Sequence, residues 1–410
     1  MTSAAERRVR PEAAIKGMFL LFGFGIAAFF PFLAIYLRGY HGLDESEIGL
    51  VIAALALARL IASPLWGHFS DTRLGRLTAL QIGVGGSAVA AIAFNLVDPL
   101  WAILAVAFVH ATFMVAFGPN VDAIALVHLG DERMADYGRI RAGESATYAA
   151  GCFLFGGLLQ VAGVGWALPL YAIASVAALV WSFTLERDRP VRPEGHGRLG
   201  AVGAVFKQAP RFWVFLIAVA LVWTGFNAAW NFIALKIEDA GGGPFLIGIG
   251  TALGGLIEVP TMRSSSRLQR RLGLRKVYAL GCVIYGTGFL LWGAVNDARI
   301  LSMLTVFEGV AFSLLFTTGV VIVGRLLPSN LYSTGNAVAS MVGFGFGPII
   351  GAGIGGFIYQ HAGTTVLYSG ASVLALAAAV VAWFGLKLPA LDQPVVPPVV
   401  TSLPEAGPLP

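Results

Sequence analysis

Long apolar stretches separated by short polar segments form the dominant pattern of this chain. A helix needs roughly 20 apolar residues to cross the hydrocarbon layer of a bilayer. Twelve stretches meet this requirement, at approximately 14–37, 48–67, 77–97, 100–127, 137–162, 165–185, 212–236, 244–263, 275–294, 299–325, 332–359 and 364–387. The pattern predicts an all-α membrane protein with twelve transmembrane helices.

The longest polar interruption divides these helices six and six. It covers residues 186–211, is basic, and contains Pro and Gly, so it cannot span a membrane. We therefore expect an N-terminal six-helix bundle over 1–185, a cytoplasmic linker over 186–211 and a C-terminal six-helix bundle over 212–388. Residues 389–410 are too rich in proline for a helix and too few for a domain, which predicts a disordered cytoplasmic tail.

The two predicted bundles resemble each other weakly in sequence. A shift of 199 residues places the second apolar stretch on the eighth and superposes Gly49 on Gly248, and Arg59 then falls on Glu258. Transporters built from parallel repeats show such a period, with the substrate site between the halves near the midplane. A generic glycine-rich helix composition would give a similar match, so both interpretations stay open.

Composition agrees with a membrane protein. Hydrophobic residues make up 57% and charged residues 12% of the chain, against about 25% charged residues in soluble domains. The mean hydropathy is +0.79. The two cysteines, Cys152 and Cys282, both fall in apolar stretches, where we expect them to pack as small hydrophobic residues.

The net charge of +5 does not indicate nucleic-acid binding, because the positive charges follow the predicted topology. With the N-terminus inside, and with Arg59 and Arg141 placed at membrane depth, only Arg38, Lys236 and Arg299 lie outside; all other Lys and Arg residues lie on the cytoplasmic side. Positive charge on cytoplasmic loops sets orientation. No cleavable signal precedes the first helix. We expect a multi-pass protein of the cytoplasmic (inner) membrane with both termini in the cytoplasm.

Charged residues in the fourth and fifth helices are the first candidates for function. Asp122 and Arg141 are nearly equidistant from the turn at Gly130, so an antiparallel hairpin would hold them at the same depth, where pairing costs less than isolation. Glu144 and Tyr148 continue the Arg141 face, since positions i, i+3 and i+7 share one side of a helix. We expect these four side chains in a substrate site.

Three more ionisable residues lie at membrane depth. Arg59, Glu258 and Glu308 are costly in hydrocarbon unless they are paired, hydrated or, for the acids, protonated. Together with Asp122 they are candidates for proton coupling, with a structural ion pair as the alternative. Helix seven carries Trp223, Asn227, Trp230 and Asn231 at helical spacing, a face suited to a ring-bearing solute or, alternatively, to contacts between helices.

The segment PLWGHFSDTRLGRL at 64–77 resembles the signature of the major facilitator superfamily in the loop after the second helix. It differs in having Thr72 where a basic residue is usual and in one extra residue before the second glycine. The resemblance implies the major facilitator fold of two six-helix bundles. It also implies a cytoplasmic latch in which a glycine allows close approach and charged side chains hold the loop; here these are Gly67, Asp71, Arg73, Gly75 and Arg76.

Within that superfamily, the fourth and fifth helices are similar to the branch of lactose permease and the phenylpropionate-type permeases. The similarity rests on Pro119-x-x-Asp122 and on the run from Tyr137 to Arg141. It implies that Asp122 and Arg141 contact substrate. Glu144 departs from the small or aromatic residue expected there, so the resemblance does not imply a substrate.

These patterns predict a secondary active transporter that moves a small polar organic solute, such as a sugar, a glycoside or a small aromatic acid, by alternating access. We expect protons as the coupling ion and a monomer in the lipid bilayer. A proton-driven efflux pump for drugs or a biosynthetic metabolite is the alternative. No metal-ligand spacing, hydrolase motif or nucleotide-binding loop is present, so we expect no metal, no cofactor and no enzymatic activity, and we disfavour a membrane sensor because no signalling domain is visible.

Overall fold

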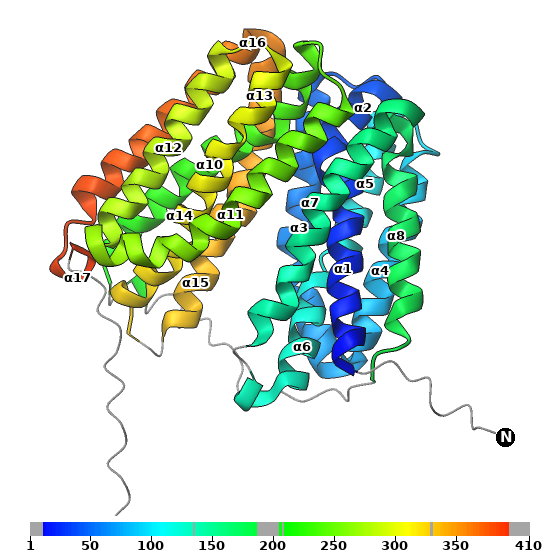
Figure 1. The fold of residues 1–410 in the computed structure, drawn as a ribbon, viewed down its shortest axis with the longest axis horizontal. Helices are drawn as coiled ribbons and strands as arrows, with labels where there is room; N and C mark the ends of the chain where they lie inside the picture. The colour runs from blue at the N-terminus through cyan, green and yellow to red at the C-terminus, as the bar shows by residue number, and fades with distance from the viewer. Residues whose placement is uncertain (1–10, 134–135, 187–204, 207–208, 329–330, 393–410) are drawn as a thin grey trace, which may run out of the picture.

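The structure, a computed structural model, describes residues 11–133, 136–186, 205–206, 209–328 and 331–392, and contains helices and turns but no strand in these ranges. One group of helices comes from the first half of the chain (Figure 1). Its elements are α1 (Pro11–Phe29), η1 (Phe30–Phe32), α2 (Leu33–His41), α3 (Glu45–Phe69), η2 (Ser70–Leu74), α4 (Arg76–Phe94), α5 (Leu100–Met114), α6 (Phe117–Arg133), α7 (Tyr137–Ala162), η4 (Val164–Trp166) and α8 (Ala167–Ser182).

The second group of helices comes from the second half of the chain and lies beside the first (Figure 1). Its elements are α10 (Arg211–Asp239), α11 (Pro244–Leu272), α12 (Leu274–Ala294), α13 (Ala298–Leu304), α14 (Val306–Leu326), α15 (Tyr332–Ser340), η6 (Met341–Phe346), α16 (Gly347–Val380), η7 (Val381–Gly385) and α17 (Pro389–Asp392).

Eleven helical segments of the described chain are long and apolar enough to cross a membrane, and their positions agree with the predicted stretches. The last of them, Tyr332–Gly385, is 54 residues long and counts as one only because helix continues on both sides of Gly363. Gly363 has φ 84° and ψ 169°, outside the helical region, and turns the chain back there. This segment therefore supplies two passes, which gives the predicted twelve.

Two details differ from the prediction. The signature segment expected as a loop is helical: α3 continues to Phe69 and a π-helical turn follows over Ser70–Leu74. The first residues of the predicted tail, Pro389–Asp392, form a short helix, and the carboxylate of Asp392 accepts a hydrogen bond from Arg275 Nε at 2.5 Å. Most of the predicted linker (187–204 and 207–208) and the rest of the tail (393–410) lie outside the described residues.

The turns of the first half recur in the second. Only glycines have positive φ among the described residues, as expected for a conformation that strains residues with a Cβ. Six of these seven glycines form three pairs, 199, 198 and 200 residues apart: Gly42 and Gly241, Gly75 and Gly273, and Gly163 and Gly363. The repeat inferred from Gly49 and Gly248 thus extends to the backbone of the turns.

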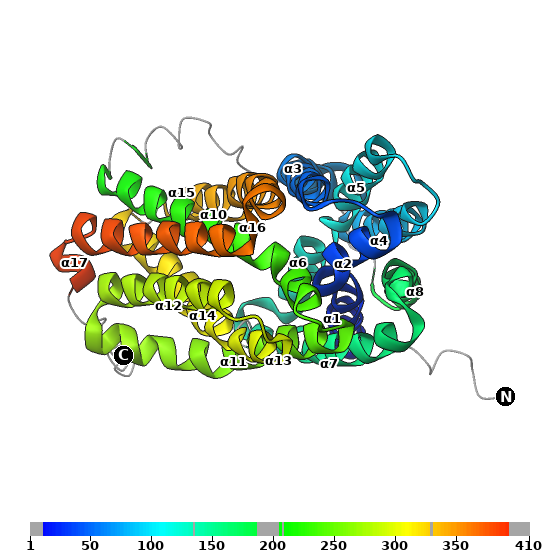
Figure 2. The ribbon, with the colours of Figure 1, turned by 90° about the horizontal axis from the view of Figure 1, so that it is seen from above.

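The two groups of helices touch at two glycine contacts. A Cβ on Gly49 of α3 would lie 2.5 Å from the carbonyl oxygen of Ala352 on α16 and 3.2 Å from Cα of Gly356. The second contact, between α11 and α7, pairs Gly248 with Gly156 at the same close approach. Figure 2 shows α3 beside α16 on one flank and α11 beside α7 on the other. Small residues allow this approach where no hydrophobic force draws helices together in lipid.

Ionic contacts also join the two groups, at the upper end in Figure 1, where α2 lies. Arg38 contacts Asp239 at 2.6 Å, Glu45 at 2.7 Å and Glu238 at 3.3 Å. We call this the Arg38 end. Every hydrogen bond and ion pair that joins two described residues across the groups lies here, including the bond from Ser46 Oγ to the side-chain oxygen of Gln360.

Candidate functional site

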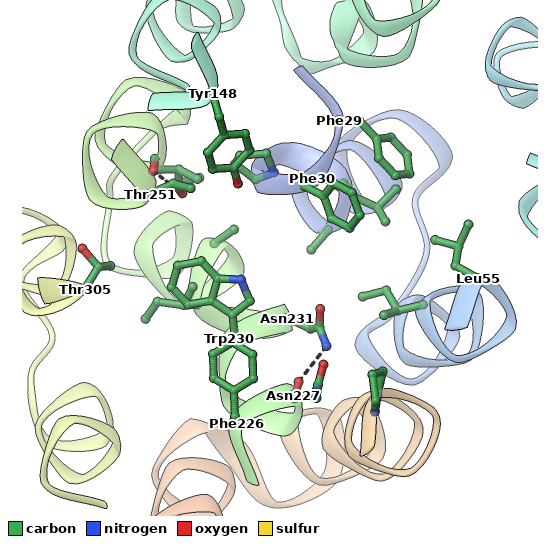
Figure 3. A pocket seen from close by; sticks show the side chains of 18 of the residues that line it. Phe29, Phe30, Leu55, Tyr148, Phe226, Asn227, Trp230, Asn231, Thr251 and Thr305 are labelled. Atoms are coloured by element: carbon green, nitrogen blue, oxygen red, sulfur yellow. Dashed lines mark hydrogen bonds between the residues drawn. The ribbon is translucent and has the colours of Figure 1, made fainter. Parts of the chain in front are cut away.

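A cavity of about 270 Å³ lies between the two groups of helices. Figure 3 shows its lining side chains converging on a common space. The first group contributes residues of α1, η1, α2, α3, α5 and α7. The second contributes residues of α10 and α11, Thr305 before α14, and the region around η6. Its aromatic lining residues are Phe29, Phe30, Tyr148, Phe226, Trp230 and Phe344. The cavity is therefore a mostly apolar site with a few polar groups, as is typical of small-molecule pockets.

Five residues proposed from the sequence line this cavity: Arg59, Tyr148, Asn227, Trp230 and Asn231. The two asparagines are one turn apart on α10. Asn227 Nδ2 donates to the carbonyl of Trp223 at 2.8 Å, and Asn231 Nδ2 donates to the carbonyl of Asn227 at 2.7 Å (Figure 3). These bonds fix both side chains against their own helix and leave the amide oxygens free to accept from a solute.

Arg59 is the charged residue in the cavity lining. Its Nε lies 3.4 Å from the carbonyl oxygen of Leu55 on the same helix, and its guanidinium carbon is 5.5 Å from the centre of the Phe30 ring. No acidic side chain among the described residues lies close enough to offset the charge. The two terminal nitrogens have no hydrogen-bond partner in the described part of the chain.

Two threonines add polar atoms to the same wall without adding free donors. Thr251 Oγ1 donates to the carbonyl of Ile247 at 3.0 Å, and Thr305 Oγ1 lies 2.7 Å from the carbonyl oxygens of both Gly250 and Ser302. Sequence reasoning missed these residues and the phenylalanines of the lining. Hydroxyl and phenyl groups are common in packed membrane helices, so only the fold separates those that face a cavity from those that do not.

The predicted cluster on α6 and α7 forms, but outside the cavity lining. Asp122 lies 3.2 Å from Arg141 and 2.7 Å from the hydroxyl of Tyr137, and Glu144 lies 3.6 Å from Arg141. The Arg141 side chain is 48% exposed. The ion pair inferred from equal depth in the hairpin is present, whereas a direct role of these three residues in substrate binding stays a prediction.

Other proposed residues also lie outside the lining. Trp223 is buried and packs against Phe226, Phe312 and Phe344, so it supports the wall from behind. Glu258 and Glu308 lie close enough for their charges to interact, and both are near Tyr148. Glu308 is 6% exposed, and neither carboxyl has a basic partner or a hydrogen bond among the described residues.

The predicted latch is partly formed. Asp71 lies 3.7 Å from Arg76, and Gly75, with φ 77°, makes the sharp turn between η2 and α4. Arg73 is exposed, and open space surrounds the Cα of Gly67. The close approach expected at Gly67 is therefore absent in this conformation, which is closed at the Arg38 end instead.

Twelve membrane passes in two similar groups, with a solute-sized cavity between them, define the protein as a membrane transporter. The chain belongs to the MFS_1 like family, whose sequence model matches residues 13–369, and so to the major facilitator transporters. It is a transporter and not an enzyme.

Relatives with known names agree with this class. The maltose permease of Geobacillus stearothermophilus is 26% identical over 350 residues, which cover 84% of this chain and 86% of the permease. The lactose permease of Klebsiella oxytoca is 25% identical over 69% of this chain and 73% of its own length. The crystal structure of the nucleoside transporter NupG superposes with a TM-score of 0.82 at 16% identity, over 93% of this chain and all of that one, which shows a shared fold.

Proposed function

We propose that this protein carries a small, ring-bearing polar solute, such as a sugar, a glycoside or an aromatic acid, through the cavity between its two groups of helices. The observation that carries the proposal is the combination of that cavity with hydrogen bonds and ion pairs that, among the described residues, join the two groups at one end only. A substrate site between two similar bundles is the arrangement in which rocking of one bundle against the other gives alternating access.

We infer further that the Arg38 end faces outward. Positive residues concentrate at the opposite end, as expected for the cytoplasmic side. In this orientation the structure is closed to the outside, and solute leaves or enters the cavity from the cytoplasm. Both termini then lie in the cytoplasm, and the pair Asp71 and Arg76 becomes a cytoplasmic latch that tightens in the opposite, outward-facing state.

Binding is assigned to the groups that line the cavity. Tyr148 and Trp230 offer ring surfaces, Asn227 and Asn231 offer amide oxygens, and Arg59 offers a guanidinium. Asp122, Arg141 and Glu144 lie on the same helix pair as Tyr148, with Glu144 one turn from it. We propose them as contacts on the solute's route from the cytoplasmic side.

Proton coupling is assigned to Glu258 and Glu308. An unpaired carboxylate in a low-dielectric interior is unfavourable, so a carboxyl there binds a proton until hydration or a new partner releases it. Their proximity to Tyr148 links the acid pair to the cavity lining. Movement of α11 against α14 would change the surroundings of both acids.

The test is uptake by full-length protein in proteoliposomes with an imposed proton gradient, using radiolabelled maltose, lactose, uridine and benzoate. We expect accumulation of one solute above equilibrium in wild type. Glu258→Gln should abolish accumulation yet keep exchange at equal concentrations, because only the coupling group is lost. Unchanged accumulation in Glu258→Gln would remove that residue from the coupling role. If the proton gradient instead drives ethidium away from the side of the bilayer that the cytoplasmic end of the protein faces, and none of the four solutes is taken up, the efflux alternative is supported.

A further inference from the structure

We propose that the cavity selects a solute bearing a single carboxylate, and that Arg59 binds that group. This inference rests on the proposed transport function and narrows its substrate class. It starts from the hydrogen-bonding capacity of the lining. The hydroxyls of Thr251 and Thr305, and one N–H of each amide of Asn227 and Asn231, already have backbone acceptors. Arg59 retains both terminal nitrogens, with four N–H groups unused.

The charge of Arg59 strengthens the argument. A guanidinium at membrane depth is expensive without a counter-ion, and such residues normally pair with an acid. Two acids were placed at membrane depth in the second group of helices, Glu258 and Glu308, but neither pairs with Arg59 in this structure or lines the cavity. The missing anion can therefore come from the solute.

The geometry favours a carboxylate over a phosphate. A guanidinium and a carboxylate share a planar two-pronged geometry and form paired hydrogen bonds. A phosphate monoester carries nearly two negative charges at neutral pH, and the lining offers one cation to meet them. The rest of the solute is a ring, because six aromatic side chains are among the lining, and the Phe30 ring centre lies 5.5 Å from the guanidinium carbon.

The experiment compares matched acids and neutral analogues on purified full-length protein. Affinities for benzoate and benzamide, for glucuronate and glucose, and for glucose 6-phosphate are measured by ligand-dependent thermal stabilisation. Charge-assisted hydrogen bonds predict that at least one acid binds roughly 10- to 100-fold more tightly than its neutral analogue. Equal affinity within both pairs, no binding by any acid, or tightest binding of the sugar phosphate would overturn the assignment.

Variants locate the effect. In Arg59→Gln we expect the acid-to-neutral ratio to fall to about one while affinity for the neutral analogue is kept, which also shows that the variant is folded. Arg59→Met serves the same purpose if the glutamine variant is unstable. Arg325→Gln removes an exposed positive charge at the end of α14 and should leave the ratio unchanged. A ratio that survives in both Arg59 variants would overturn the role of Arg59.

The outcome is separable from that of the transport proposal. If an acid binds tightly through Arg59 but is not transported in proteoliposomes, the carboxylate site is supported. The same result counts against the transport of acids of that class. If maltose or uridine accumulates and substitution of Arg59 does not change that accumulation, the transport proposal is supported and the carboxylate site is rejected.

Discussion

The contact of α3 with α16 and the contact of α11 with α7 use the same backbone arrangement with different polar groups. Gly49 and Gly356 meet in the first, and Gly248 and Gly156 meet in the second. A glutamine closes each contact, on α16 in the first and on α7 in the second. Gln360 accepts from Ser46 Oγ in the first, and Gln160 accepts from the backbone N–H of Phe245, at 3.3 Å, in the second. These partners are related by the same repeat of about 200 residues.

The ion network is present at only one of the two contacts. Arg38 and Glu45 belong to it, and the repeat places Ile237 and Pro244 at the equivalent positions of the other half. Tyr359 of α16 adds a hydrogen bond from its hydroxyl to Asp239. Close packing of glycines therefore occurs at both contacts, whereas the ion network that closes the Arg38 end occurs at one of them. The difference teaches that packing and charge make separable contributions to the closed state.

The largest expected effect comes from filling a glycine contact. In Gly356→Ala the new Cβ would overlap the carbonyl oxygen of Glu45, and in Gly156→Ala it would lie 2.8 Å from that of Pro244. Backbone atoms cannot rotate away, so we expect a destabilisation of about 1–3 kcal/mol in each, seen as a lower melting temperature in detergent. Gly353→Ala and Gly157→Ala are controls on the same helices, where the nearest atoms lie 4.0 and 3.8 Å away. Equal melting temperatures for the test and control variants would show that the contacts are loose.

An intermediate effect is expected from Arg38→Gln. Two of its three ion pairs, to Glu238 and Asp239, join the two groups of helices. They are partly exposed, so each is worth about 0.2–1 kcal/mol, and their loss should open the Arg38 end by roughly 2- to 30-fold. Distance measurements between spin labels on α2 and α16 report the shift, and high salt should reproduce it in wild type. Arg299→Gln, an exposed charge near the same end, should leave the distances unchanged. Asp122→Asn breaks an ion pair within one half and should also leave them unchanged; a similar shift there would mean that the distances follow general destabilisation.

The smallest effect is expected from Gln160→Ala and Gln360→Ala. Each removes one hydrogen bond between neutral groups, with a cost of about 1 kcal/mol. Because the two glutamines are equivalent in the repeat, the two melting temperatures should fall by similar amounts. A much larger loss in Gln360→Ala would show that the glutamine beside Arg38 supports the ion network as well.

Much of the fold follows from periodicity and length. Twelve apolar stretches and a shift of 199 residues anticipated the helices, the boundary between the stretches 332–359 and 364–387, and the pairing of Gly49 with its repeat partner Gly248. These features depend on local composition, which a single chain displays. The ion pair of Asp122 and Arg141 was also predictable, since both residues belong to one hairpin whose midpoint is visible in the sequence.

The cavity could not be predicted in the same way. Tyr148 lines the cavity, whereas Glu144, one turn away, does not. This difference depends on how the two bundles meet, and the residues that meet there lie far apart in the sequence. Arg59 and Trp223 illustrate the limit. Both are polar or amphipathic residues at membrane depth, yet Arg59 lines the cavity and Trp223 packs behind it.

The whole chain contains two cysteines, and both are fully buried, which makes the unmodified protein its own reporter of opening. Cys152 lies in the seam between α7 and α11, with its carbonyl oxygen against Gly248, whereas Cys282 lies within α12. Separation of the seam would expose the first thiol to a water-soluble maleimide and leave the second protected. The ratio of the two labelled peptides in a mass spectrum would then follow the transport cycle in native membranes, with no engineered residue.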